Sequence, residues 1–253
     1  MIPATKRDYL HQLVDAKNRW SRQLTVEEKA LGFLGWHERG YLPHCDFPGL
    51  VQFVTFRLVD SLPASRRGEW EHLLAIEDAR ERRTQLEAYL DRGVGACQLR
   101  DPRFAGLAEE AFLHRHLQTH ELLAWCVMLN HIHVLVHVWQ TPLWKLIKSW
   151  KVHVALGARR LTPERRIPIR REDTTTRPAP NGSSALQWQR EYWDTFMRDE
   201  QQERTAIRYI ESNPVKATLC HTPEEWAFSS ARFRDTNRRL AIPLGAPNSN
   251  SAR

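Results

Sequence analysis

The chain has 253 residues, of which 37 are Lys or Arg and 30 are Asp or Glu, so its formal net charge is +7. This excess favours a polyanionic partner, nucleic acid first and a membrane surface second, although a merely basic soluble protein has the same balance. The four cysteines form no Cys-x-x-Cys pair, which argues against a zinc ribbon and a secreted disulfide framework. We find no apolar signal segment and no uninterrupted apolar run of membrane-spanning length, and we therefore expect a cytoplasmic protein.

The first predicted elements are a helical extension and a strand. Residues 1–40 are expected to be helical and peripheral, because Thr25 and Glu28 stand at capping-box spacing and Gly40 follows as a terminator. The Pro- and Gly-rich loop GYLPHCDFPG should lead into a strand over residues 50–60, which is rich in β-branched and aromatic side chains. On this strand one face carries Val54, Phe56 and Leu58, and the other carries Thr55 and Arg57.

The middle of the chain alternates helices with a hairpin. The segment RRGEWEHLLAIEDARERRTQLEAYLDRG predicts one helix, and AGLAEEAFLHRHLQTH predicts the next. LLAWCVM and HIHVLVHV predict a β-hairpin, and PLWKLIKSWKVHVAL predicts an amphipathic helix with Leu146, Trp150 and Val154 pointing inward. Together these elements predict an α+β fold, with one small antiparallel sheet and helices packed mainly on one face.

The last third of the chain begins with a basic segment. Residues 159–187 are rich in Arg and Pro, and we expect them to form a mobile loop. A helix should begin at Asp199 and end before Pro214. A further helix should begin at Thr222, and residues 236–253 are expected to form a disordered tail.

Two histidines interrupt the apolar strand HIHVLVHV. Strand alternation places His131 and His133 on one side, and neutral imidazole is a good ligand for borderline divalent metals. Taken alone, such a pair more often means two surface histidines on a half-exposed sheet. A structural zinc site made of the pair together with His137 and Cys126 is a third possibility.

A second candidate pair lies on the helix that begins at Asp199. Tyr209 and Asn213 are four residues apart, hence on one helix face. Tyrosine is a competent covalent nucleophile, and an amide oxygen is an acceptable ligand for a hard divalent ion. Each residue also has a structural interpretation: Tyr209 as a packed aromatic, and Asn213 as a helix terminator before Pro214.

Three blocks in order resemble a known family. MLNHIHVLVHV followed by WQREYWDTFMRDEQQERTAIRYIESNPVKATL resembles the REP-associated tyrosine transposases, relatives of the single-tyrosine HUH transposases. GYLPHCDFPGLVQFVTFRLVDSLP fits a subgroup of that family, so the resemblance runs from Gly40 to Phe233. It implies a ferredoxin-like sheet with the two histidines on its central strand, within a catalytic domain over residues 41–235.

The resemblance also implies a role for each motif residue. His131 and His133 would bind Mg²⁺ or Mn²⁺, Asn213 would complete the protein ligands, and Tyr209 would be the nucleophile. The family cleaves single-stranded DNA beside hairpins of repetitive extragenic palindromes (REPs) through a 5′-phosphotyrosine intermediate, and can rejoin the ends. The alternative is a domesticated protein that binds such hairpins without cutting. We expect a monomer, located in the cytoplasm at the nucleoid.

Some positions depart from the family or leave a choice open. Leu129 stands where the family usually has proline, and Thr218 where it usually has glycine, and we expect altered loop geometry at most. Tyr192 is the rival nucleophile, although its two neighbouring tryptophans favour a packed aromatic cluster. Glu211 and Asp194 are available as general bases, and nothing in the sequence favours either.

DNA binding would rest on the basic excess, and its affinity should fall steeply with salt. A ridge of lysines on the amphipathic helix is more often a solvated face than a DNA contact. Trp144 is a candidate for stacking on unpaired bases. The candidate phosphate contacts are Arg57 on the strand, Lys145, Lys148 and Lys151 on the helix, and Arg165, Arg166, Arg170 and Arg171 in the basic loop.

Overall fold

The computed structural model describes residues 22–38, 43–162 and 186–242. Its central sheet has four antiparallel strands in the order β4 (His120–Val127), β5 (His131–Val138), β3 (Leu50–Arg57) and β6 (Trp193–Phe196). Helix α5 (Pro102–Leu113) precedes β4, and α6 (Leu143–Leu161) connects β5 to β6. This β-α-β-β-α-β order is the ferredoxin-like arrangement, so the predicted α+β fold is confirmed.

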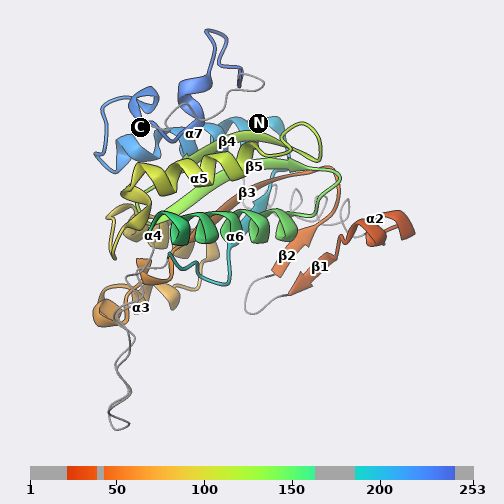
Figure 1. Cartoon of the computed structure of the whole chain (residues 1–253). Helices are drawn as coiled ribbons and strands as arrows, with labels where there is room; N and C mark the ends of the chain where they lie inside the picture. The colour runs from red at the N-terminus through yellow and green to blue at the C-terminus, as the bar shows by residue number, and fades with distance from the viewer. Residues whose placement is uncertain (1–21, 39–42, 163–185, 243–253) are drawn as a thin grey trace, which may run out of the picture.

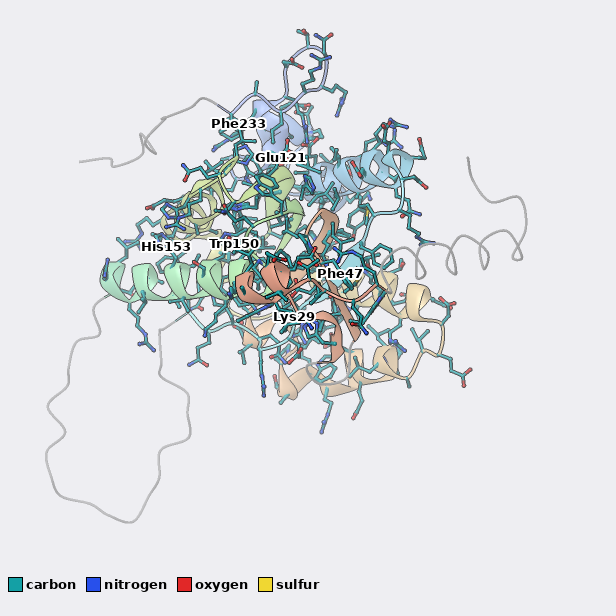
Figure 2. The ribbon with its side chains drawn as sticks, turned by 90° about the vertical axis from the view of Figure 1, so that its right-hand side faces the viewer. Lys29, Phe47, Glu121, Trp150, His153 and Phe233 are labelled. Carbon is teal, nitrogen blue, oxygen red and sulfur yellow. The ribbon has the colours of Figure 1, made fainter. Side chains whose placement is uncertain are left out.

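Helices α5 and α6 lie side by side across one face of the sheet (Figure 1). Phe56 of β3 packs against Trp150 of α6, and Trp150 in turn contacts Phe112 of α5. Trp150 is buried in this core, whereas His153, three residues later, is exposed, with its Nε2 3.7 Å from a carboxylate oxygen of Glu110 on α5 (Figure 2). The inward stripe predicted for α6 is therefore confirmed, as is the apolar face predicted for β3.

The opposite face of the sheet is also covered. Helix α7 (Glu200–Lys216) packs Ala206 and Ile210 against Leu135 of β5 and Cys126 of β4. Helices therefore pack on both faces, which differs in this detail from the expected one-sided packing. The reason lies in β5, which pairs with a strand on each side and buries nearly all of its residues.

Residues 1–21 of the predicted helical extension lie outside the described part of the chain, and the helix within residues 22–38 ends earlier than predicted. The capping box of Thr25 and Glu28 is present, but α2 (Val26–Leu31) ends at Gly32, which takes a left-handed conformation with φ 97°. The chain then forms β1 (Gly35–Glu38), which pairs with β2 (Pro43–Asp46) where a loop was expected. The prediction that this helix continues to Gly40 is therefore wrong, because the left-handed conformation of Gly32 ends the helix eight residues earlier.

Other helix boundaries also differ from the sequence prediction. The segment predicted as one helix forms α3 (Arg67–Leu74) and α4 (Ala79–Asp91), because the Asp78 carboxylate accepts a hydrogen bond from the Glu81 backbone and starts a new helix. Pro214 does not end α7, which continues to Lys216. Proline in the last turn removes one backbone donor, a loss that a 17-residue helix tolerates.

The remaining predicted segments are short or fall partly outside the described residues. The helix expected from Thr222 is reduced to two 3₁₀ turns, Pro223–Glu225 and Ser230–Phe233. The first residues of the expected mobile loop still belong to α6, and residues 163–185 and 243–253 lie outside the described part of the chain. None of the described helices has the length and apolar composition needed to cross a membrane.

Thr218 is strained immediately after α7. Its φ of 57° is left-handed, a conformation that costs a β-branched residue about 1 kcal/mol or more relative to glycine. Thr218→Gly should therefore raise the free energy of unfolding by about 1 kcal/mol, or Tm by about 2–4 °C. Urea unfolding measures the change, and Thr205→Gly inside α7 should have the opposite sign. A destabilised Thr218→Gly would show that no strain is relieved.

Glu211 anchors the C-terminal segment to α7. Its buried Oε1 accepts hydrogen bonds from the Ser230 hydroxyl and the Arg234 guanidinium, each at 2.7 Å. Glu211→Ala leaves that guanidinium uncompensated, and the free energy of unfolding should fall by about 3–5 kcal/mol. The matched control is Glu200→Ala in the same helix, whose ion pair with Arg204 is exposed and should contribute less than about 1 kcal/mol. Equal losses in urea unfolding would contradict the anchoring role.

Candidate active site

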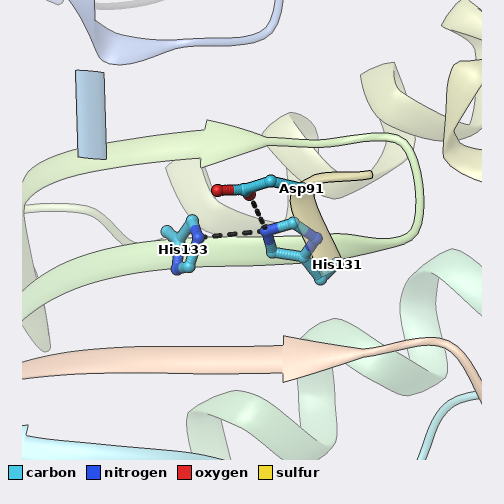
Figure 3. Close-up of side chains that lie close together, drawn as sticks. All are labelled: Asp91, His131 and His133. Atoms are coloured by element: carbon cyan, nitrogen blue, oxygen red, sulfur yellow. Dashed lines mark hydrogen bonds and ion pairs between the residues drawn. The ribbon is translucent and has the colours of Figure 1, made fainter. Parts of the chain in front are cut away.

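His131 and His133 lie on the face of β5 that α4 and α7 cover. Their strand partners on β3 are Arg57 and Thr55, so the side chains of all four point to the same side of the sheet. Both imidazoles are fully buried, and their Nε2 atoms are 3.0 Å apart (Figure 3). The strand alternation read from the sequence is confirmed, while the alternative of surface histidines is wrong.

The hydrogen bonds around the two rings fix one imidazole and leave the other adjustable. Asn130 donates its Nδ2 to the Val94 carbonyl, so its Oδ1 accepts from His131 Nδ1 at 2.8 Å. In the neutral ring this places the lone pair of His131 at Nε2. The Thr55 hydroxyl lies 2.9 Å from His133 Nδ1 and can either donate or accept. When it accepts, both Nε2 lone pairs point to one place, which a cation would fill.

Burial keeps His133 in the neutral form that a metal ligand needs. The pKa of His133 lies well below its ordinary value, chiefly because burial disfavours the charged ring and next because His131 is adjacent. Neutral imidazole binds divalent metals through a free ring nitrogen. The site is therefore prepared for a cation without first releasing a proton from His133.

Asp91 supplies the carboxylate of the site. It is the last residue of α4, and its Oδ1 lies 3.4 Å from His131 Nε2 without a hydrogen-bond partner of its own (Figure 3). One ligand atom from each of Asp91, His131 and His133 lies within 4.8 Å of the other two. Two imidazoles and one carboxylate fit a divalent ion such as Mn²⁺, Mg²⁺ or Zn²⁺.

Sequence reasoning missed Asp91. The signal available was a pair of carboxylates four residues apart, Glu87 and Asp91, on one face of a helix. That signal is weak, because such pairs are common on solvated helices. The pair becomes part of the site only because α4 packs against the face of the sheet that carries His131 and His133.

Tyr209 of α7 faces the same site. Its ring packs edge-on against the rings of His133 and Phe53, with centroids 5.7 Å away in each case. Its hydroxyl donates a hydrogen bond of 2.7 Å to Glu87, and Lys216 Nζ lies 4.3 Å from the ring centroid. The pKa of Tyr209 is raised, first by burial and then by the Glu87 charge. The free site therefore holds Tyr209 protonated.

Asn213 lies one turn after Tyr209 and is fully buried. Both atoms of its side-chain amide are buried without a hydrogen-bond partner. Leaving a buried amide unpaired costs about 1–3 kcal/mol, so such a group calls for a ligand. The orphaned oxygen is consistent with the role of metal ligand that the resemblance implies.

The rival residues are engaged elsewhere. Tyr192 is 5% exposed, and its ring packs against His44 with centroids 4.8 Å apart. Asp194 binds His44 Nδ1 at 2.5 Å, and Glu211 binds Ser230 and Arg234. Neither carboxylate approaches the hydroxyl of Tyr209 through any contact in the described structure.

The alternative zinc site is not assembled. The Cys126 thiol contacts the Met128 sulfur at 3.6 Å, and burial raises its pKa well above the ordinary value. His137 points elsewhere, with its Nδ1 3.8 Å from Oε2 of Glu121. Within the described residues, Asp91, His131 and His133 are the group of three or more His, Cys, Asp or Glu side chains with metal-binding geometry.

The candidate DNA-contact residues differ in whether their side chains are exposed or bound to other groups of the protein. Arg57 lies on the histidine face, where it binds the Ser61 hydroxyl and approaches the Trp193 ring. Lys148 is exposed. Three of the other candidate DNA-contact residues donate hydrogen bonds to backbone carbonyls. Lys145 binds the carbonyl of Leu31, Lys151 binds that of Gln189, and Trp144 binds that of Gly32. Arg165, Arg166, Arg170 and Arg171 lie outside the described residues.

Comparisons with known proteins give a sparse result. No family model matches the chain, and no curated protein matches it. A search of solved structures finds one described as a REP-associated tyrosine transposase bound to a REP hairpin. The TM-score is 0.40 at 16% identity, and the match covers 83% of this chain and 89% of that chain. That structure belongs to the family that the sequence motifs resemble.

Proposed function

We propose that this protein is a metal-dependent single-stranded DNA endonuclease and strand transferase that acts at REP hairpins. The observation that supports the proposal most is the arrangement of His131 and His133, whose Nε2 atoms are 3.0 Å apart beside Asp91. Tyr209 lies on the same face with its ring against His133. A buried metal-ligand set in contact with a tyrosine ring has little use in a protein that only binds DNA.

The metal would be held by the imidazoles of His131 and His133 and the carboxylate of Asp91, with Asn213 offering its orphaned amide. When bound, Mg²⁺ or Mn²⁺ partly neutralises and polarises the phosphodiester. The chain itself contributes a buried site in which Asn130 orients His131, and the Thr55 hydroxyl, as acceptor, would leave His133 Nε2 free for the metal. The donor set fits both ions, and the family resemblance favours them over zinc.

The nucleophile is the Tyr209 hydroxyl. Its oxygen forms a bond to the scissile phosphorus, and the bond from phosphorus to the 3′-oxygen breaks. The products are a 5′-phosphotyrosine and a free 3′-hydroxyl. Because the phosphotyrosine is an ester of similar energy, a 3′-hydroxyl of another strand can reverse the step without ATP.

The hairpin substrate is proposed from the motif resemblance, and the charge of the chain supports a nucleic-acid partner. Arg57 is a candidate phosphate contact beside the site, and Lys148 is an exposed cation on α6. Binding through such contacts falls linearly in log affinity with log salt. We also propose that the protein acts as a monomer in the cytoplasm, at the nucleoid.

The test uses a single-stranded REP hairpin oligonucleotide labelled at either its 5′ or its 3′ end. Each is incubated with the protein and Mn²⁺ and then separated on a denaturing protein gel. Cleavage through Tyr209 transfers the 3′ label to the protein and leaves the 5′ label on a shortened free strand. Chelation of the metal should prevent both. Tight hairpin binding without any adduct would instead support the non-cutting hairpin-binding protein.

A further inference from the structure

Glu87 is a buried carboxylate aimed at the hydroxyl of Tyr209. It lies on α4, one helical turn before Asp91, and is 7% exposed. Its Oε2 accepts the Tyr209 hydroxyl at 2.7 Å. An acceptor at this distance is within the reach required of a general base. Sequence reasoning left the base unassigned, and both of the carboxylates it considered bind other partners.

Arg83 holds Glu87 in this orientation. Its Nε donates to the second carboxylate oxygen of Glu87 at 2.9 Å. The same guanidinium binds the Thr195 hydroxyl on β6 and stacks over Phe53 of β3 at 4.7 Å. The carboxylate is thus fixed to the sheet through Arg83, which leaves the other oxygen, Oε2, directed at Tyr209.

We propose that Glu87 is the catalytic base that accepts the Tyr209 proton during cleavage and returns it during rejoining. The proposal rests on the function proposed above. As the Tyr209 oxygen bonds to phosphorus, its proton passes to Glu87 Oε2. The electron pair of the broken bond leaves with the 3′-oxygen, which takes a proton from water and leaves a hydroxide ion, while Glu87 keeps the tyrosine proton. In rejoining, the attacking 3′-hydroxyl gives its proton back to that hydroxide, and Glu87 protonates the departing Tyr209 oxygen.

The need for such a base follows from the state of the nucleophile. Tyrosine has an ordinary pKa of about 10, so its phenolate is scarce near neutral pH and the attacking hydroxyl must lose its proton. A positioned proton acceptor contributes about 10²–10⁴-fold to the rate of such a step. Glu87 can supply this contribution without any movement of α4 or α7, because the hydrogen bond is already formed.

The first test compares Glu87→Gln with wild type in the rate of adduct formation. Glutamine can still accept the tyrosine hydrogen bond but cannot take the proton, so the rate should fall at least about 100-fold. Hairpin affinity and Mn²⁺ affinity should not change. The matched control is Glu69→Gln, because Glu69 accepts the hydroxyl of Tyr89 in a similar pair outside the site. Its rate should equal that of wild type.

The second test separates proton transfer from a structural role. Tyr209 is replaced with a fluorinated tyrosine whose hydroxyl is more acidic, in both the wild-type and the Glu87→Gln background. If Glu87 removes the proton, the fold-decrease in rate caused by Glu87→Gln should be much smaller in the protein with the fluorinated tyrosine than in the protein with ordinary tyrosine. An undiminished penalty overturns the proposal, since a purely structural defect ignores nucleophile acidity. Glu87→Asp, which keeps the carboxylate, should retain more of the rate than Glu87→Gln.

The two proposals fail in different ways. An absence of any wild-type adduct, or an adduct that persists in Tyr209→Phe, overturns the proposed function itself. A wild-type adduct that forms at full rate in Glu87→Gln overturns only the assignment of the base. Urea unfolding of each variant shows whether a slow rate reflects loss of the fold. If Glu87→Gln is unfolded, the rate of Glu87→Asp is compared with that of wild type instead.

Discussion

Tyr209→Phe is expected to abolish the covalent protein–DNA adduct and to leave hairpin affinity unchanged. Phenylalanine lacks the attacking oxygen, whereas the ring contacts with His133 and Phe53 do not depend on it. The measurement is transfer of the 3′ label to the protein on a denaturing gel, with hairpin affinity followed by the anisotropy of a labelled hairpin.

Tyr192→Phe is the matched control for that experiment. Tyr192 is also a buried tyrosine beside a histidine ring, but that histidine is His44, which is outside the metal-ligand group. The control should form the adduct as wild type does. If instead Tyr192→Phe abolishes the adduct and Tyr209→Phe does not, the nucleophile has been assigned to the wrong residue.

His133→Ala is expected to remove divalent-ion binding from the protein in the absence of DNA. Loss of a group that merely orients a metal ligand weakens metal affinity about 10–100-fold, so loss of a ligand should exceed 100-fold. Titration calorimetry with Mn²⁺ measures this directly. The change also leaves a cavity in a fully buried position, so the fold must be checked by urea unfolding.

His137→Ala controls for the general effect of removing an imidazole from β5. His137 lies further along the same strand, is partly exposed, and approaches Glu121 rather than the metal-ligand group. Mn²⁺ affinity should be unchanged in this variant. Equal losses in both variants would indicate a nonspecific effect and would contradict the proposed ligand set.

The parts of the site that sequence could predict are those set by local periodicity. Alternation along a strand places His131 with His133, and helical spacing places Tyr209 with Asn213, whatever the rest of the chain does. The strand β3, the hairpin β4–β5 and the helix α6 followed from the same kind of pattern, whereas β6 was not predicted and the ferredoxin-like arrangement was expected only from the family resemblance. These inferences needed only the repeat of a single element.

The parts that sequence could not predict depend on packing between distant elements. Asp91 and Glu87 reach the site only because α4 packs over the histidine face, and nothing within α4 specifies that contact. The lysine ridge on α6 shows the converse. Its spacing suggested a free cationic face, but Lys145 and Lys151 bind carbonyls of segments far away in sequence. Long-range contacts decide which side chains of a regular pattern remain available.

The side chain of Asn130 joins two halves of the site that the chain supplies separately. One end of its amide orients His131 on β5, and the other holds the Val94 carbonyl in the turn that follows α4. Undocking of α4 would therefore release the His131 ring as well as Asp91. A metal ion that binds only while α4 is docked would stabilise the docked helix. Ion binding should therefore slow amide hydrogen exchange along α4.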